Sequence, residues 1–239
     1  MGRNVLIIGA SGEIGRAVYK QIAADGDHLI LHYYQNKQGL QFTDIMQQES
    51  ILMEIKADLS TANGVNHLLN QLTLPVDAVV FAGGKAHTGL FQDTDDTIMD
   101  SMLTLHVKAP WQISRHILPH MIARKQGNII MITSIWGEVG ASHEVVYSSV
   151  KGAQNSFIKA LAKETAPSGI SVNAVSPGFI DTKMNEHLLP EEKEAIIQDI
   201  PAGRAGTVED VAHAVSFLMN EKSGYINGEI IHVTGGWLS

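Results

Sequence analysis

The residues best suited to carry out chemistry lie between positions 134 and 151. Ser134 follows the apolar run 128–132, which predicts a buried strand, so its hydroxyl is expected just beyond the carboxyl end of that strand. Tyr147 and Lys151 stand four residues apart at the start of a long helical pattern, which places both side chains on one helix face. A serine, a tyrosine and a lysine gathered in this way could polarise and protonate a carbonyl oxygen. Such chemistry also needs a hydride donor and a pocket.

A glycine-rich turn near the amino terminus is the expected place for a cofactor that brings the hydride. Residues 5–8 are an apolar run typical of a central parallel strand, residues 9–15 read Gly-Ala-Ser-Gly-Glu-Ile-Gly, and an amphipathic helix is predicted over about 14–24. In this order the glycines let the backbone approach a pyrophosphate, whose charge the helix N-terminus favours. We therefore interpret the segment as a dinucleotide-binding turn rather than an ordinary tight turn.

The end of the second predicted strand, residues 29–33, indicates which dinucleotide is bound. An acidic residue there would bind the ribose 2′-hydroxyl of NAD, but residues 32–37 read His-Tyr-Tyr-Gln-Asn-Lys. The missing carboxylate, with Lys37 and Arg16 nearby, favours NADP(H), although either cation could instead be a solvated surface charge. Asp58, which follows a third strand at 51–55, could reach the adenine ring or simply cap the next helix.

Strands and helices alternate along the rest of the chain. Further strands are predicted at 76–81, 128–132, 170–175 and 229–233, with helices at about 95–124 (interrupted near Pro110 and Pro119), from Tyr147 to about 164, and at 208–219. Residues 183–203, which we call the lid segment, carry a net charge of −3 and are expected to be loop-prone. The alternation predicts an α/β fold: a single domain over residues 1–239, built as a Rossmann-type, doubly wound parallel sheet of about seven strands with helices on both faces.

The composition restricts the classes of function. The 239 residues carry a formal net charge of −8 and no basic run, which disfavours nucleic-acid binding. Disulfides, thiol catalysis and cysteine zinc sites are excluded because there are no cysteines. His116 and His120 have the spacing of a metal-binding pair, but Pro119 intervenes and no acidic ligand is close, so we expect no metal. Without a signal-type segment or an apolar run of 18 residues, we expect no membrane insertion and a cytoplasmic location.

Together these motifs resemble those of the short-chain dehydrogenases/reductases over all 239 residues. The motifs are Ser134, the Tyr-x-x-x-Lys pair thirteen residues later, Asn173, residues 177–182 and glycines 228, 235 and 236. We interpret Tyr147 as the general acid in reduction and Lys151 as the cation that favours its phenolate, while Ser134 stabilises the oxyanion. The resemblance also implies a homotetramer. The cofactor-binding residues expected are Gly9, Ser11, Gly12, Glu13, Ile14, Gly15, Lys37, Asp58, Leu59, Ala82, Gly83, Gly84, Tyr147, Lys151, Pro177, Gly178, Ile180 and Thr182.

Three departures from the family pattern concern the site. Glu13 stands where the middle glycine of the turn is usual, and the usual Asn-Asn-Ala-Gly after the fourth strand is Phe-Ala-Gly-Gly at 81–84. The backbone role of both segments stays plausible. The third is His106, which stands where the family has an asparagine that holds a water in the proton relay. We assign His106 to the catalytic residues, because a histidine can donate, accept or carry a proton near neutral pH.

The substrate is the least determined part. Within the family the chain most resembles bacterial 3-oxoacyl-acyl-carrier-protein reductases and, among these, the elongation factor P 5-aminopentanone reductases. In this fold the loop between the serine and the tyrosine borders the substrate, so the substrate residues expected are Trp136, Glu138 and Glu144. Two carboxylates and an acidic lid segment would suit an amine-bearing substrate, whereas an acidic acyl-carrier protein prefers basic docking residues. Alternatively, both glutamates are solvated loop charges.

Hypotheses from two other classes stay open. A cofactor-sensing regulator would bind the dinucleotide without turnover, and a scaffolding subunit would use only the assembly surfaces of the fold. Regulators of this kind usually lose the tyrosine or the lysine, and this chain keeps both. Ketone reduction is therefore the leading hypothesis, with the carbonyl substrate and the physiological direction undecided.

Overall fold

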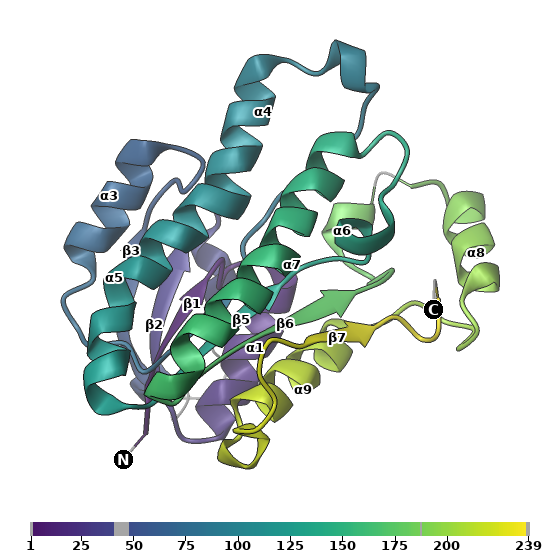
Figure 1. Cartoon of the computed structure of the whole chain (residues 1–239). Helices are drawn as coiled ribbons and strands as arrows, with labels where there is room; N and C mark the ends of the chain where they lie inside the picture. Colours follow the sequence, from purple (N-terminus) through teal and green to yellow (C-terminus); the bar gives the residue numbers. More distant parts are fainter. Residues whose placement is uncertain (1, 41–47, 187, 238–239) are drawn as a thin grey trace.

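The computed structural model describes residues 2–40, 48–186 and 188–237, and within them the chain forms a seven-stranded parallel sheet with helices on both faces (Figure 1). The strands lie in the order β3-β2-β1-β4-β5-β6-β7, which confirms the predicted doubly wound α/β fold. Their bounds are β1 Asn4–Ile8, β2 His28–Tyr33, β3 Ile51–Lys56, β4 Ala78–Phe81, β5 Gly127–Ile132, β6 Ile170–Pro177 and β7 Ile230–Val233.

The central strands form where the sequence has uninterrupted apolar runs. All four residues of β4 and the last four of β1 are buried. Leu6 pairs with Ile30 on one side and with Val79 on the other, so β1 has a parallel neighbour at each edge. A parallel strand covered by helices on both faces has no exposed side, which explains why the run does not alternate with polar residues.

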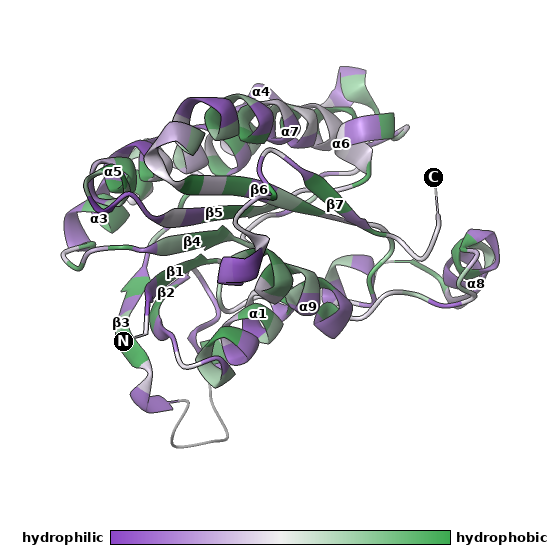
Figure 2. Ribbon diagram, turned by 60° about the horizontal axis from the view of Figure 1, so that its bottom comes forward, coloured by the Kyte–Doolittle hydropathy of each residue, from purple (hydrophilic) through white to green (hydrophobic). Residues whose placement is uncertain are grey.

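Two helical layers enclose the sheet (Figure 2): α3, α4, α5 and α7 cover one face, and α1 and α9 the other. Ile113 and Ile158 belong to the first core, Tyr19 and Val215 to the second. In the part of the chain that the structure describes, no helix is long and apolar enough to cross a membrane. The helices are α1 Glu13–Ala24, α3 Ala62–Gln71, α4 Asp96–Leu103, α5 Ala109–Arg124, α6 Trp136–Val139, α7 Val145–Thr165, α8 Pro190–Asp199 and α9 Val208–Met219.

The order of strand addition reverses between β1 and β4. β2 and β3 extend the sheet on one side of β1, and β4 to β7 extend it on the other. In open α/β sheets a crevice forms at such a switch point, beyond the carboxyl ends of the strands, and ligands bind there. The segments that follow β1, β4, β5 and β6 are therefore the ones that can build a site.

The helix predicted over 95–124 is interrupted near Pro110, as expected, but not near Pro119. A π-helical segment, Thr104–Lys108, joins α4 to α5 just before Pro110, whereas Pro119 lies inside α5. Pro110 has no N–H to donate to the carbonyl of His106 four residues earlier. Gln154 Nε2 donates to that carbonyl instead, at 2.7 Å. The irregularity therefore centres on His106.

The lid segment also differs from the loop that its sequence predicts, because it contains the helix α8 and a short 3-10 turn, η5 (Lys183–Asn185). Pro190 opens α8, where its fixed φ suits a helix start, and Glu192 accepts the N–H of Leu189 at 2.8 Å. No residue of α8 is buried. Since a helix without a buried face has no apolar repeat, the periodicity could not predict it.

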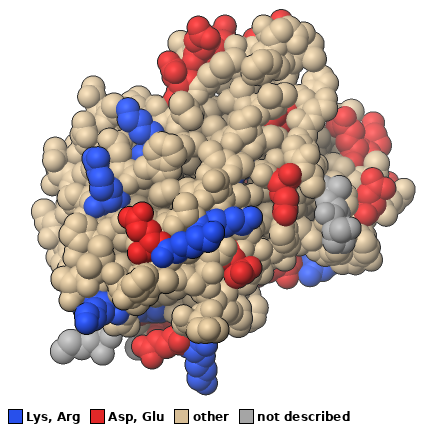
Figure 3. Space-filling model, in the orientation of Figure 1, with Lys and Arg blue, Asp and Glu red and all other residues tan. Residues whose placement is uncertain are grey.

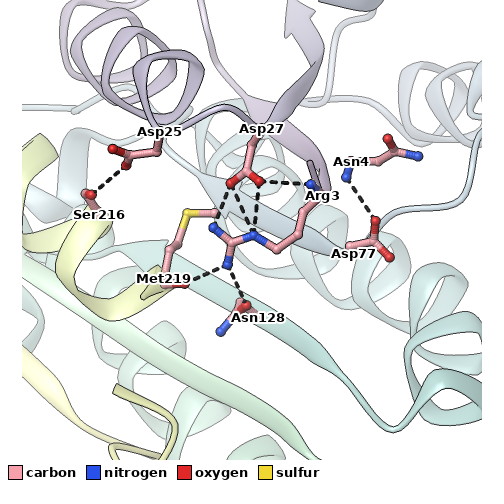
Figure 4. Close-up of polar contacts among 8 residues, drawn as sticks. All are labelled: Arg3, Asn4, Asp25, Asp27, Asp77, Asn128, Ser216 and Met219. Atoms are coloured by element: carbon pink, nitrogen blue, oxygen red, sulfur yellow. Dashed lines mark hydrogen bonds and ion pairs between the residues drawn. The ribbon is translucent and has the colours of Figure 1, made fainter. Parts of the chain in front are cut away.

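At the amino-terminal edge of the sheet, a network of charged groups joins several elements (Figure 4). The guanidinium of Arg3 donates to both carboxylate oxygens of Asp27, at 2.6 Å for the shortest contact, and to the carbonyl of Met219 at 2.6 Å. Asp27 is only 6% exposed. Arg3 therefore ties the start of β1 to the start of β2 and to the end of α9 through charge-assisted hydrogen bonds.

Candidate active site

The structure brings Ser134, Tyr147 and Lys151 together in one cavity at the carboxyl edge of the sheet. Ser134 follows β5, and the other two residues lie near the start of α7. All three are buried, with exposed fractions of 8%, 8% and 4%. The structure thus places the end of β5 against one face of α7, as the sequence predicts.

Hydrogen bonds hold the three side chains in place. The Ser134 hydroxyl and the Tyr147 phenol are hydrogen-bonded to each other. The Lys151 ammonium lies 5.6 Å from the centre of the Tyr147 ring, and it donates to the carbonyl of Ile132 at 2.9 Å. The last residue of β5 thus positions the lysine.

Burial changes the pKa of both titrating groups. It raises the pKa of Tyr147 to about 12; the hydrogen bond with Ser134 lowers this pKa and the charge of Glu144 raises it. Burial also lowers the pKa of Lys151 to about 7. The phenol therefore keeps its proton at neutral pH, while the lysine beside it gains and loses charge in that range. A protonated phenol at the cavity wall is a proton donor.

His106 lies against this group from the π-helical segment. Its ring meets that of Tyr147 edge-on, with the centroids 5.8 Å apart. Nε2 contacts the carbonyl of Lys85 at 2.9 Å, so the proton sits on Nε2 and Nδ1 is an acceptor. Burial, with a further contribution from the charge of Lys151, lowers the pKa of His106 to about 3. Of the three roles expected of His106, donating, accepting or carrying a proton, the charged form is disfavoured near neutral pH because the ring is buried.

The glycine-rich turn packs too closely to admit side chains at two of its positions. Gly9 has φ 78° and a Cβ on it would lie 2.3 Å from Gly83 Cα, while a Cβ on Gly15 would lie 2.2 Å from the Gly9 carbonyl. Gly12 is the N-cap of α1 and offers no side chain to its first N–H groups, which stay available to an anion. Ile14 lines the cavity, and Gly12 and Glu13 line an adjoining outer hollow. Ser11 is half-buried in the same turn.

A histidine that the sequence reading did not single out supports this turn. His32 Nδ1 accepts the N–H of Gly9 at 3.1 Å, and Nε2 donates to the carbonyl of Ala57 at 3.0 Å. Burial lowers its pKa to about 4, so the neutral ring links the turn to the end of β3. A histidine directly after the apolar residues 29–31 of β2 was the available signal.

The residues expected around the adenosine have other partners in the structure. Lys37 forms an ion pair with Glu54 of β3 at 2.9 Å. Asp58 accepts hydrogen bonds from the N–H and hydroxyl of Ser60, at 3.0 and 2.6 Å. Burial alone would raise the pKa of Asp58, but these bonds, together with that from Tyr34 and the charge of Lys85, lower it. Leu59 is 3% exposed in the core, so only its backbone can face a ligand.

The remaining cofactor candidates form the walls of the cavity. Gly84 leaves room for the His106 ring, since a Cβ there would lie 2.8 Å from Cε1. Met184 and Asn185 of the lid segment also line the cavity, although the sequence reading did not name them. Their contribution depends on how the lid segment folds back, for which no local pattern exists. The predicted wall residues that do line the cavity are Ala82, Gly83, Gly84, Pro177, Gly178, Ile180 and Thr182.

The three expected substrate residues separate in the structure. Trp136 and Glu144 line the cavity, and Trp136 packs edge-on against Trp237 near the carboxyl terminus, with ring centroids 5.6 Å apart. Glu138 does not line the cavity; its carboxylate contacts Nε2 of His232 on β7 and faces a separate hollow. The expectation for Glu138 is corrected, since α6 turns this side chain away from Tyr147.

This fold and this arrangement of serine, tyrosine and lysine define an oxidoreductase of the doubly wound α/β class. A family model described as enoyl-(acyl carrier protein) reductase matches residues 9–238. The chain belongs to the short-chain dehydrogenase/reductase family, whose members act on CH–OH and ketone groups.

Individual proteins are similar over nearly the whole chain. The uncharacterized oxidoreductase YmfI of Bacillus subtilis is 45% identical over 99% of both chains. A 3-oxoacyl-[acyl-carrier-protein] reductase of Rickettsia conorii is 34% identical over 99% of this chain and 97% of its own. The crystal structure of a 3-oxoacyl (acyl-carrier-protein) reductase from Agrobacterium tumefaciens with NADP bound has 27% identity and a TM-score of 0.89, covering 99% of this chain and 94% of that one.

Proposed function

We propose that the protein is an NADP(H)-dependent reductase that converts a ketone to an alcohol. The observation that carries this proposal is the meeting of Ser134, Tyr147 and Lys151 in one cavity at the switch point between β1 and β4. A hydroxyl donor, a protonated phenol and a buried cation are the groups that reduction of a carbonyl requires from the protein.

The residues present fit a dinucleotide. A Cβ on Gly9 would lie 2.3 Å from Gly83 Cα, so only backbone fits where these two turns meet, and the start of α1 presents uncapped N–H groups for a pyrophosphate. The inner cavity and the outer hollow share several lining residues, so together they extend from Lys151 to Gln35. A nicotinamide bound at the inner end would supply the hydride.

The protein's own part is to orient the carbonyl and deliver a proton. Ser134 donates a hydrogen bond to the carbonyl oxygen, on which negative charge develops. Tyr147 gives its proton to the same oxygen, and the charge of Lys151 stabilises the phenolate that remains. His106 stays neutral and buried behind the tyrosine ring, so its role is to hold the ring and the loop at Lys85 rather than to transfer a proton.

NADP(H) is favoured over NAD(H) by the end of β2, which has no carboxylate for the ribose 2′-hydroxyl. Lys37 is one candidate for binding a 2′-phosphate, but its ammonium is engaged by Glu54. The relative from Agrobacterium tumefaciens, crystallised with NADP, adds support.

The primary candidate substrate is a 3-oxoacyl thioester, because relatives of this chain are named for that reaction. A homotetramer, a protein-borne substrate, a cytoplasmic location, and one domain over residues 1–239 with the lid segment at about 183–203 remain part of the same proposal. The alternative from another class, a silent cofactor sensor, would bind NADPH without turnover.

A second candidate is a 5-aminopentanone reductase that acts on modified elongation factor P. Glu144 places a carboxylate in the cavity wall. Acidic side chains also gather over the start of α4 and around α8, at the top and right of Figure 3. A substrate that carries an amine, or a basic protein surface around it, would be attracted to these charges. Exposed members of these groups are Asp93, Asp95, Asp96, Glu191, Glu192 and Glu194.

The experiment is NADPH oxidation, with NADH in parallel, against an acetoacetyl thioester, an amino-ketone and a neutral ketone of similar size. Preference for the thioester would support the primary candidate, and preference for the amino-ketone the second. Tight NADPH binding without turnover of any of them would favour the sensor. Absence of binding would reject the proposed function as a whole.

Glu144→Gln separates the two substrate candidates further, with Glu138→Gln as a matched control outside the cavity. For the amino-ketone reductase we expect Glu144→Gln to raise KM for the amino-ketone about five- to tenfold and to leave KM for the neutral ketone unchanged. Glu138→Gln should change neither. Equal effects of Glu144→Gln on both ketones would remove the argument for an amine-bearing substrate.

A further inference from the structure

A long-range hydrogen bond joins the glycine-rich turn to the lid segment. Glu13, the first residue of α1, accepts the backbone N–H of Lys183 through Oε2 at 2.6 Å, across 170 residues of sequence. The family pattern has a glycine at this position, which could not make the bond. The replacement of the family's glycine by Glu13 therefore adds a contact between α1 and the lid segment.

The bond stands at the boundary between the inner cavity and the outer hollow. Both spaces are lined by Ile14, Thr182 and Met184, whereas Glu13 and Lys183 line only the outer one. A dinucleotide that extends from Lys151 outward, as the proposed function requires, would pass between the start of α1 and the start of the lid segment. The bond connects these two walls.

We propose that Glu13 is a positioning residue that straps the start of the lid segment to α1 and thereby slows the release of the dinucleotide. A hydrogen bond to an ionised carboxylate is among the stronger ones in proteins, and the N-terminus of α1 favours the negative charge. The strap fixes Thr182 and Met184, which line the cavity beside it. This inference rests on the proposed binding of NADP(H).

Two variants separate the hydrogen bond from the charge. Glu13→Gln keeps a carbonyl acceptor but removes the charge next to the expected pyrophosphate, whereas Glu13→Ala removes both. Lys183→Pro deletes the donor and leaves Glu13 intact; Thr182 is extended before it (φ −147°, ψ 164°), and position 183 opens a 3-10 turn, so proline fits the backbone. Glu192→Ala is the matched control, because Glu192 makes a similar carboxylate bond to Leu189 within the lid segment.

The test is the dissociation rate of NADPH in stopped-flow fluorescence, combined with hydrogen exchange of the Lys183 amide in the protein without NADPH. We expect Glu13→Ala and Lys183→Pro to release NADPH at least about fivefold faster than Glu13→Gln, and Glu192→Ala to stay within about twofold of the wild type. The Lys183 amide should be protected in the wild type and in Glu13→Gln but not in Glu13→Ala.

Two results would count against different parts of the argument. Equal release rates for Glu13→Ala and Glu13→Gln, with the wild type binding NADPH, would overturn the strap and leave the proposed function standing. Failure of the wild type to bind NADPH would reject the proposed function, while the exchange of the Lys183 amide would still report whether the bond exists. Thermal unfolding of each variant identifies any that fails to fold, and the Lys183→Pro variant then replaces Glu13→Ala.

Discussion

Buried charged side chains have different partners at the two ends of the parallel strands, the amino edge where the strands begin and the carboxyl edge where they end. At the amino edge, Arg3 is matched by the carboxylate of Asp27 and by a backbone carbonyl, in a network that joins β1, β2 and α9 (Figure 4). At the carboxyl edge, Lys151 is 4% exposed, donates to the neutral carbonyl of Ile132, and has its pKa lowered to about 7. A matched pair holds the fold in one state, whereas a buried base without a carboxylate partner can change its charge at neutral pH.

Buried polar atoms near the site also lack hydrogen-bond partners within the described part of the chain. Around the cavity, His106 Nδ1 and Gln154 Oε1 are buried and have no hydrogen-bond partner among the described residues. Such groups cost stability. Proteins accept this cost where chemistry needs a preorganised polar environment, so we expect mutations at the carboxyl edge to change activity and those at the amino edge to change stability.

The largest expected effect is the loss of activity in Tyr147→Phe. Removing the proton donor should lower kcat about 1,000-fold, because general acids contribute on this scale. NADPH affinity, measured by fluorescence titration, should change little. Tyr225→Phe, at a fully exposed tyrosine, is the control. Retention of more than a tenth of the wild-type kcat in Tyr147→Phe would refute the proposed mechanism.

The next largest expected effect is a gain in stability when the charge of Lys151 is removed. Lys151→Met should raise the free energy of unfolding by about 1–4 kcal/mol at pH 6 while abolishing turnover. Its pKa is about 7 in the folded protein and 10.5 without the protein environment, so the unfolded chain binds more protons between these values. Wild-type stability therefore rises with pH through this window, and the advantage of Lys151→Met should shrink towards pH 10.

Urea unfolding at pH 6, 8 and 10 measures this difference, with Lys159→Met as a control at an exposed lysine of the same helix. The control should show no pH-dependent gain. A constant difference between Lys151→Met and the wild type at all three pH values would mean that the Lys151 pKa is not lowered by burial.

At the amino edge, removing the buried cation should instead lower the free energy of unfolding. Arg3→Met leaves the carboxylate of Asp27 buried without its cation, so we expect a loss of about 2–3 kcal/mol in unfolding free energy. The kcat of the folded fraction should be unchanged. Arg124→Met breaks a more exposed pair with Asp77 and should cost less than about 1 kcal/mol. A fall in kcat for Arg3→Met without a fall in stability would contradict the division between the two edges.

The smallest expected effect concerns cofactor choice. Glu54→Gln should release Lys37 from its ion pair and raise the ratio of NADPH to NADH efficiency about two- to fivefold, because exposed ion pairs are weak. Lys37→Ala should lower the same ratio. If neither variant changes the ratio of kcat/KM values for the two cofactors, Lys37 is the solvated surface charge that the sequence left open.

Much of the fold was accessible from the sequence, because apolar runs and the strand–helix alternation depend on short-range patterns. The predicted positions of β1, β5 and α9 agree with the structure to within one residue at each end for which a bound was given. Two parts of the fold did not follow from these patterns. α8 has no buried face, and the irregularity at Thr104–Lys108 arises from a carbonyl that Pro110 cannot satisfy but Gln154 can.

By itself, the sequence determined the class of fold and the gathering of Ser134, Tyr147 and Lys151, since a strand end and an i,i+4 pair are short-range relations. Only the tertiary structure decided that Glu138 turns to His232 and that Glu13 binds Lys183, 94 and 170 residues away. It also decided how far burial lowers the pKa values of His106 and Lys151. Contacts between distant segments and the exclusion of water both arise from packing, which no local pattern of residues encodes.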